Sequence, residues 1–202
     1  MEISECPQCG AATNPSGRKC EYCKASFYVT SLAYLGGFDS GGVSKYLKHY
    51  KELTRQDPNN TEGLLGLGLC YLQMSTYPLA KKCFEQIIEA SPDVSQAYYY
   101  YSLSTIKKRR LMTLSLNEVR QLETYLNTAI QLDGEMPQYK LLLAMLKRDY
   151  YETNGMKVPP PNATELLGEI NEIQINRNEI NHLRGSVKVE KEEQYYDSLT
   201  VV

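Results

Sequence analysis

Four cysteines near the start of the chain are the residues most able to do chemistry. They form two C-x-x-C pairs, Cys6/Cys9 and Cys20/Cys23, which ten residues separate. Two thiolates at this spacing can turn toward one ion, and two such pairs supply the four tetrahedral ligands of a closed structural zinc site, with Zn–S distances of about 2.3 Å. The spacing therefore predicts one structural Zn²⁺ with no position left for water or substrate. A disulfide pair or a redox C-x-x-C is the alternative.

The residues that follow each pair affect the turn that presents backbone amides to sulfur. Gly10 follows Cys9 and permits a positive φ, whereas Lys24 stands at the corresponding place after the second pair. A left-handed conformation at Lys24 would cost about 1–2 kcal/mol, which metal binding can offset. The arrangement resembles a zinc ribbon, which we place at residues 1–30 with residues 27–29 as its last strand.

Composition and charge limit the partners and the compartment. The 202 residues can bury one core and a small accessory module, and 22 basic against 24 acidic residues give a net charge of −2. Counterion release therefore provides no general attraction to nucleic acid, so nucleic-acid binding is not expected. We see no signal peptide and no apolar stretch of about 18 residues that could span a membrane, so we expect a cytoplasmic, reducing setting that favours zinc over disulfides.

A helical period begins near residue 43 and is clearest between residues 61 and 92. The small and apolar positions that define it are Leu64, Leu67, Gly68, Tyr71, Ala80, Phe84 and Pro92. This spacing resembles one tetratricopeptide repeat (TPR), with Leu64 in place of the usual tryptophan. Pro58 precedes Pro92 by 34 residues, one period of that repeat, so residues 43–56 are expected to form the second helix of an incomplete repeat.

The rest of the chain extends this pattern and then leaves it. Tyr98 and Tyr101 begin a further repeat, whose second helix is delayed by about eight extra residues within Lys107 to Glu118, and a last helix is expected at residues 138–151. The predicted fold is mostly α, a small β zinc-ribbon module followed by a TPR-like α-solenoid. Its parts are a zinc ribbon (1–30), a Gly-rich linker (31–42), repeats (43–152), a Pro-rich break (153–161), an amphipathic helix (162–184) and a polar tail (185–202).

The TPR resemblance implies an inner, concave surface made by the first helix of each repeat. The residues it assigns to this groove are Glu62, Leu65, Leu69, Leu72, Gln96, Tyr99, Leu103 and Ile106. Chaperone-binding members of the family hold a carboxylate with charged and amide side chains at places where Leu65, Leu69, Gln96 and Tyr100 stand here. We therefore expect no chaperone-tail clamp, and predict that the groove takes an apolar helix or segment of a protein partner. Alternatively, the amphipathic C-terminal stripe of Leu166, Ile170, Ile173, Ile180 and Leu183 covers it.

One dense charge run, Lys107, Lys108, Arg109 and Arg110, follows a predicted helix. It either complements the dipole at the end of that helix or forms a docking patch for phosphate, anionic lipid or an acidic partner. The two histidines, His49 and His182, lie far apart in sequence, and no catalytic motif accompanies them, so we assign no catalytic residue.

These observations predict a non-enzymatic cytoplasmic adaptor that joins a structural zinc ribbon to a protein-interaction repeat domain. The alternative is a nucleic-acid-associated factor in which the ribbon binds nucleic acid and the repeats dock to a larger assembly. A third class, an enzyme or redox switch, would need a reactive thiolate that zinc would silence.

Overall fold

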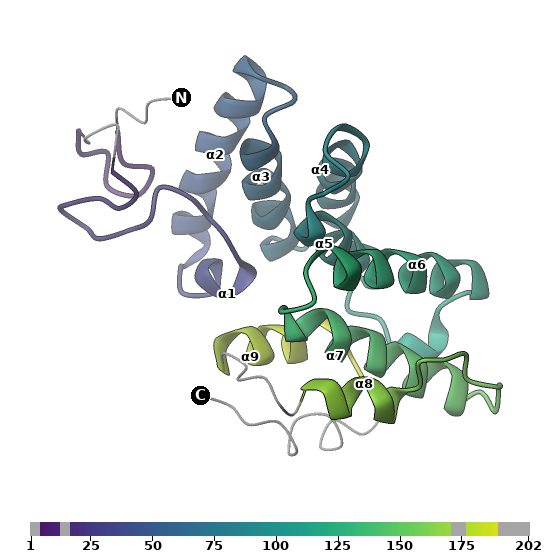
Figure 1. Cartoon of the computed structure of the whole chain (residues 1–202). Coiled ribbons are helices and arrows are strands. Elements are labelled where there is room, and N and C mark those ends of the chain that lie inside the picture. The colour runs from purple at the N-terminus through teal and green to yellow at the C-terminus, as the bar shows by residue number, and fades with distance from the viewer. Residues whose placement is uncertain (1–4, 13–16, 171–176, 190–202) are drawn as a thin grey trace. The chain divides into compact units, whose positions relative to one another are not determined.

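The computed structural model describes residues 5–12, 17–170 and 177–189, and helices α1 to α9 account for most of them (Figure 1). Its contacts divide the chain into two compact units, Met1–Ala90 and Ser91–Val202, which we call the first and second units. The predicted fold class, mostly α with helices packed as in a solenoid, is confirmed. The boundary between the units lies inside the segment 43–152 that the sequence assigned to one repeat domain.

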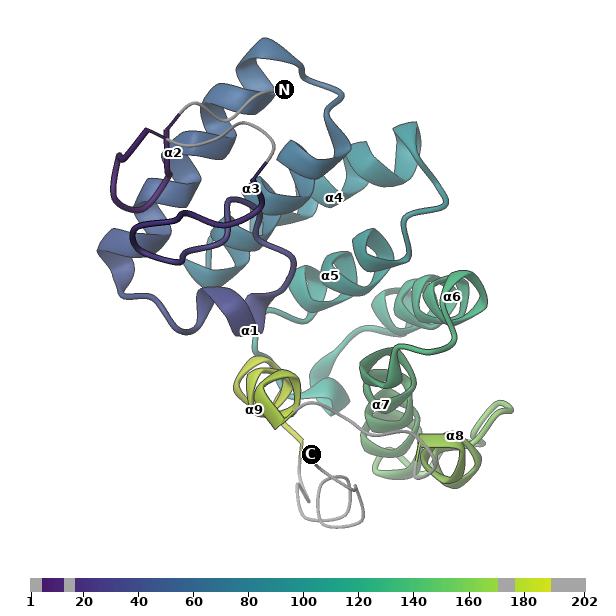
Figure 2. The same ribbon diagram turned by 60° about the vertical axis from the view of Figure 1, so that its left-hand side comes forward.

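The first unit contains the N-terminal cysteine loops and helices α1 (Leu32–Leu35), α2 (Ser40–Gln56), α3 (Thr61–Gln73) and α4 (Tyr77–Ala90). Asp39 caps α2 by accepting a 2.7 Å hydrogen bond from the Gly42 amide, and Asn60 caps α3 in the same way. The predicted linker 31–42 therefore contains α1 and the first residues of α2. Helix α3 packs on both α2 and α4, and α1 packs on α3 (Figure 2).

Two glycines of α3 let the neighbouring helices approach closely. A Cβ added at Gly68 would lie 2.6 Å from Phe84 Cε1 on α4, and one added at Gly66 would overlap the ring of Tyr50 on α2. Both aromatic rings are fully buried. The small residue at Gly68 was expected from the repeat pattern, whereas the role of Gly66 was not.

The second unit begins with α5 (Ser95–Ile106), which packs on α6 (Leu116–Leu132). The extra residues between these helices contain the 3₁₀ turn η1 (Leu111–Thr113) and two left-handed lysines, Lys107 and Lys108. Helix α6 starts with a capping box, in which the Ser115 and Glu118 side chains each bond the other residue's backbone amide. Helix α7 (Pro137–Leu146) continues into a π-helical stretch, η2 (Lys147–Glu152), and together they extend one residue beyond each end of the expected range 138–151.

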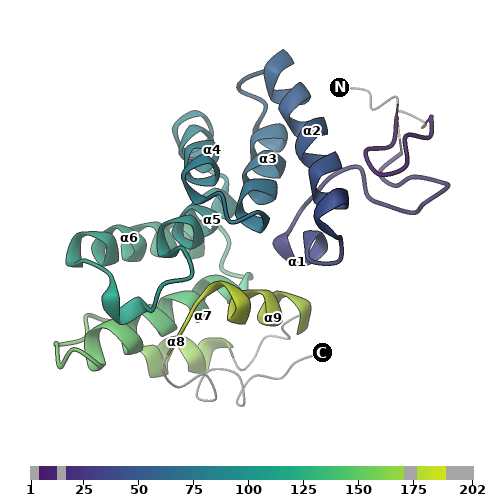
Figure 3. The same cartoon turned by 180° about the vertical axis from the view of Figure 1, so that it is seen from behind.

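The C-terminal elements of the second unit both contact α7 (Figure 3). Helix α8 (Ala163–Ile170) starts at a reciprocal capping pair, in which the Asn162 amide donates to Glu165 Oε2 and the Glu165 amide donates to Asn162 Oδ1. Helix α9 (Arg177–Ser186) buries Ile180 and Leu183. Ile173 of the predicted stripe lies outside the described residues, so the single helix expected at 162–184 stays a prediction.

Two further findings concern the whole described chain. Residues 27–29 do not form the expected strand. Isolated β-bridges hold the N-terminal loops. Across residues 5–12, 17–170 and 177–189, every helix is too short or too polar to pass through a lipid bilayer.

Candidate metal centre

The first C-x-x-C pair lies in a tight turn closed by backbone hydrogen bonds. The Gly10 amide donates to the Cys6 carbonyl at 2.9 Å, and the Cys6 amide donates to the Ala11 carbonyl at 2.9 Å. Glu5 and Ala12 form an antiparallel bridge around the turn. Gly10 has a φ of 71°, in the left-handed region that glycine adopts without strain. The turn therefore places Cys6 and Cys9 on the same side of one small loop.

The second pair repeats this turn fourteen residues later along the chain. The Lys24 amide donates to the Cys20 carbonyl at 3.0 Å, and the Cys20 amide donates to the Ala25 carbonyl at 2.9 Å. Lys24 takes the place of Gly10 and has a φ of 62°, the left-handed conformation considered from the sequence. Its ammonium group donates to the Glu21 carbonyl at 2.7 Å, a contact within its own turn. The two turns thus have the same hydrogen-bonding scheme.

The two turns bring the four cysteine sulfurs together. Cys6 Sγ lies 3.6 Å from Cys23 Sγ, and Cys9 Sγ lies 3.6 Å from Cys20 Sγ. All four sulfurs lie within 4.8 Å of one another. A tetrahedron with metal–sulfur bonds of about 2.3 Å has sulfur–sulfur edges of about 3.8 Å, whereas a disulfide requires about 2.05 Å. The cluster therefore has dimensions that fit a metal ion held by four thiolates.

Backbone amides around the sulfurs act to lower the pKa values of the cysteine thiols, and burial acts to raise them. The amides of Cys23 and, more weakly, Tyr22 donate to Cys20 and lower the pKa of its thiol to about 7. Burial raises the pKa of the Cys6 thiol, although the Cys9 and Gln8 amides oppose this effect. Cys6 and Cys20 are buried, and Cys9 and Cys23 are exposed, so the cluster has one covered and one solvent-facing side.

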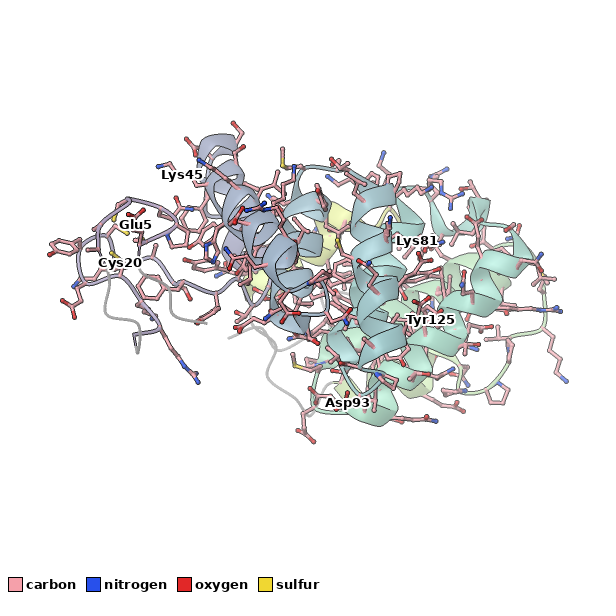
Figure 4. The ribbon with its side chains drawn as sticks, turned by 90° about the horizontal axis from the view of Figure 1, so that it is seen from above. Glu5, Cys20, Lys45, Lys81, Asp93 and Tyr125 are labelled. Atoms are coloured by element: carbon pink, nitrogen blue, oxygen red, sulfur yellow. The ribbon has the colours of Figure 1, made fainter. Side chains whose placement is uncertain are left out.

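The first turn is attached to helix α2 through Gln8, the residue between Pro7 and Cys9. Gln8 Nε2 donates to the Gly42 carbonyl at 2.8 Å, and the Gln8 carbonyl accepts from Lys45 Nζ at 2.7 Å. Figure 4 shows Cys20 on the N-terminal loops beside the helix that carries Lys45. The cysteine loops are therefore fastened to the first long helix of the unit.

Tyrosine hydroxyls make a second attachment between the cysteine loops and the helices. Tyr46 on α2 donates to the Ser26 carbonyl at 2.5 Å, and the Ser26 amide donates to the Tyr34 hydroxyl at 2.8 Å. The Tyr34 and Tyr46 hydroxyls lie 2.9 Å apart, and the Val29 amide donates to the Tyr50 hydroxyl at 2.7 Å. Sequence reasoning missed these contacts. The only signal for them was the preference for tyrosine over phenylalanine, 17 residues against three.

The predicted groove residues lie on α3 and α5. Glu62 is exposed, Leu65 and Gln96 are half-buried, and the other five are buried: Leu69, Leu72, Tyr99, Leu103 and Ile106. Their assignment to a partner-binding groove stays a prediction.

The basic run contains one half-buried arginine, Arg109, whose side chain contacts other residues, and three exposed residues, of which Arg110 forms a parallel β-bridge with Lys188. Arg109 donates to the Thr105 carbonyl at 3.0 Å and to Glu118 Oε1 at 2.5 Å, so it caps the end of α5 and ties that end to the start of α6. Lys107, Lys108 and Arg110 are exposed. The contacts of Arg109 agree with a helix-terminating role, and docking by the other three stays a prediction.

The histidines belong to different units and are half-buried. Burial lowers the pKa of His49, and burial, followed by the charge of Lys108, lowers the pKa of His182 to about 4. Both imidazoles are therefore neutral at pH 7. In the parts of the chain that the structure describes, the N-terminal cysteines are the one group of three or more Cys, His, Asp or Glu residues with converging ligand atoms.

Comparisons with known proteins give likenesses to solved structures. No model of a protein family matches the chain, and no curated protein sequence matches it. Among solved structures, the chain is similar to the crystal structure of MamA, with a TM-score of 0.47 and 20% sequence identity. The match covers 63% of this chain and 64% of the MamA chain, so the chain spans less than two thirds of that protein's length.

Proposed function

We propose that the protein is a non-enzymatic scaffold in which one structural Zn²⁺, bound by Cys6, Cys9, Cys20 and Cys23, organises the start of a helical protein-interaction domain. The observation that carries this proposal is the convergence of four cysteine sulfurs within 4.8 Å. Sets of four thiolates in tetrahedral sites are typical of zinc or iron–sulfur centres. Zinc is favoured because two turns of the C-x-x-C type form a compact site for a single ion.

The arrangement of ligands supports a structural rather than a catalytic ion. Four protein thiolates complete a tetrahedral shell, so no position remains for an activated water or for substrate. The metal would replace the thiol protons, and its binding free energy would contribute to folding. The residues around the cluster bind backbone groups of the same chain, as Gln8 does with Gly42.

Metal analysis of the full chain tests this proposal. Protein purified without chelators is expected to contain one zinc per chain, and the Cys6→Ser/Cys20→Ser double variant is expected to contain none. Cys83→Ala is the matched control, because Cys83 lies on α4, outside the cluster, and its loss should leave the zinc content unchanged. A wild-type stoichiometry near zero, or zinc retained by the double variant, would refute the metal assignment.

We further propose that the TPR-like helix α3 of the first unit binds an apolar helix or segment of a cytoplasmic protein partner. The repeat spacing around Gly68 and the close packing of α3 on α4 support a TPR-like hairpin. Leu65 is the apolar groove residue that remains half-buried, so a partner can reach it without unfolding α3. With a partner identified by affinity purification, Leu65→Glu should weaken binding and Leu79→Glu, an exposed site on α4, should not. Equal binding by both variants would show that this face of α3 does not bind the partner.

A further inference from the structure

Gln8 connects the cysteine cluster and helix α2 through three hydrogen bonds of a single residue. Its backbone amide donates to Cys6 Sγ at 3.4 Å, and its side-chain Nε2 donates to the Gly42 carbonyl at 2.8 Å. Its backbone carbonyl accepts from Lys45 Nζ at 2.7 Å. The first contact involves a proposed metal ligand, and the other two involve the N-terminal half of α2. A displacement of the first turn must therefore alter both the sulfur cluster and the docking on α2.

The second turn provides an internal comparison, because its hydrogen bonds match those of the first. Tyr22 lies between Cys20 and Cys23 at the place that Gln8 occupies between Cys6 and Cys9. Tyr22 is 75% exposed. One turn of the cluster thus faces α2 within the chain, and the equivalent residue of the other turn faces solvent.

The loop that leaves the second turn makes the remaining attachment to α2. Phe27 is buried against Cys6 and Cys20, and its amide donates to the Arg18 carbonyl at 3.0 Å. The carbonyl of the neighbouring Ser26 accepts a hydrogen bond from the Tyr46 hydroxyl, and the Tyr46 ring is fully buried. Buried hydroxyl and carbonyl groups need hydrogen-bond partners. The bond between Tyr46 and Ser26 therefore stabilises the loop in the position that it has when the four cysteines are clustered.

We propose that metal binding at the four cysteines is coupled, through Gln8 and Tyr46, to the docking of the N-terminal loops on α2. The metal-bound loops would then serve as the N-terminal cap of the helical stack, where terminal repeats need a cover for their outer face. This inference rests on the proposed metal site. It differs from the sequence-based expectation of a ribbon separated from the helices by a linker.

Coupling of this kind is reciprocal, which makes it measurable in both directions. If the metal favours the docked loops, docking favours metal binding by the same factor, so a substitution that weakens docking weakens metal binding by at most the factor that it removes from docking. Losing one hydrogen bond corresponds to a loss of affinity of about two-fold to ten-fold. Gln8→Ala and Tyr46→Phe each remove docking bonds without touching a cysteine. Tyr22→Ala is the matched control, because it changes the equivalent residue of the solvent-facing turn.

The test is a Co²⁺ titration of the full chain, followed by the thiolate-to-metal absorption, for wild type and these three variants. We expect Gln8→Ala and Tyr46→Phe to bind Co²⁺ about two-fold to ten-fold more weakly, and Tyr22→Ala to bind like wild type. Hydrogen exchange of the wild-type chain gives the reverse measurement. Removing the metal with a chelator should speed exchange of amides in α2 and leave those of α6 in the second unit unchanged.

Two other results would overturn the inference, and they have different meanings. If wild type binds Co²⁺ through four thiolates, but all variants bind equally and the exchange of α2 ignores the chelator, the coupling is absent and the metal site stands. If wild type does not bind Co²⁺ or Zn²⁺ at all, the proposed metal function fails and the coupling fails with it.

Discussion

Replacing Gly66 with alanine should destabilise the first unit, although alanine favours helices. The added methyl carbon would lie 2.5 Å from Tyr50 Cε1 and Cε2, so the ring or helix α3 must move by about an ångström to reach ordinary contact. The Tyr50 ring is fully buried, and its hydroxyl accepts a 2.7 Å bond from the Val29 amide. The ring therefore cannot retreat without losing a buried hydrogen bond.

The expected loss follows from three contributions. Overpacking a filled core costs about 1–3 kcal/mol, and losing the bond between Tyr50 and Val29 costs about 1 kcal/mol more. The gain in helix propensity from glycine to alanine returns about 1 kcal/mol. We therefore expect Gly66→Ala to lower the free energy of unfolding by about 1–3 kcal/mol.

Urea unfolding followed by circular dichroism measures this change. Gly168→Ala is the matched control, because Gly168 lies in α8 and a Cβ there meets nothing within 4 Å. That substitution should raise stability by about 0.5–1 kcal/mol. If Gly66→Ala stabilises the chain as much as Gly168→Ala does, Tyr50 does not pack over Gly66, and this close contact between α2 and α3 does not exist.

Two further predictions concern the second unit. Hydrogen bonding from Arg109 lowers the pKa of Glu118 to about 2, below its ordinary 4.5, so this carboxylate stabilises the folded chain fully above about pH 5 and loses that effect as the pH falls toward 2. Glu118→Gln should make the free energy of unfolding depend less on pH between about pH 5 and 2. An unchanged pH dependence would contradict the ion pair between Arg109 and Glu118. Lys147 Nζ lies 2.5 Å from Glu123 Oε1, and the two side chains are 3% and 14% exposed. Lys147→Met should therefore lower the free energy of unfolding by about 3–5 kcal/mol, because it leaves the buried Glu123 carboxylate without its cationic partner. Lys140→Met is its control, because the partner Glu169 is 56% exposed, and equal losses for the two variants would argue against a special role of the buried pair.

The sequence predicted the fold class because helices and their ends depend on local patterns. Apolar spacing predicted helices in the regions where α2 to α7 lie. The clustering of Cys6, Cys9, Cys20 and Cys23 could likewise be predicted, because the spacing of each pair already places two sulfurs in one turn.

The attachment of the cysteine loops to α2 could not be predicted in the same way. Gln8 reaches Gly42 across 34 residues, and Tyr50 reaches Val29 across 21, so neither contact has a local pattern. The glycines between Leu35 and Val43 looked like a flexible linker, yet they lie beside α1 and in the first turn of α2. Contacts of this kind depend on how the elements meet, and periodicity contains no information about that.

X-ray absorption spectroscopy at the zinc edge tests the central claim most directly. For the full chain purified without chelators, the four-cysteine site predicts one zinc surrounded by four sulfur atoms at about 2.3 Å, with no nitrogen or oxygen ligand. A metal shell that contains oxygen or nitrogen, or fewer than four sulfurs, would contradict a closed structural site at Cys6, Cys9, Cys20 and Cys23.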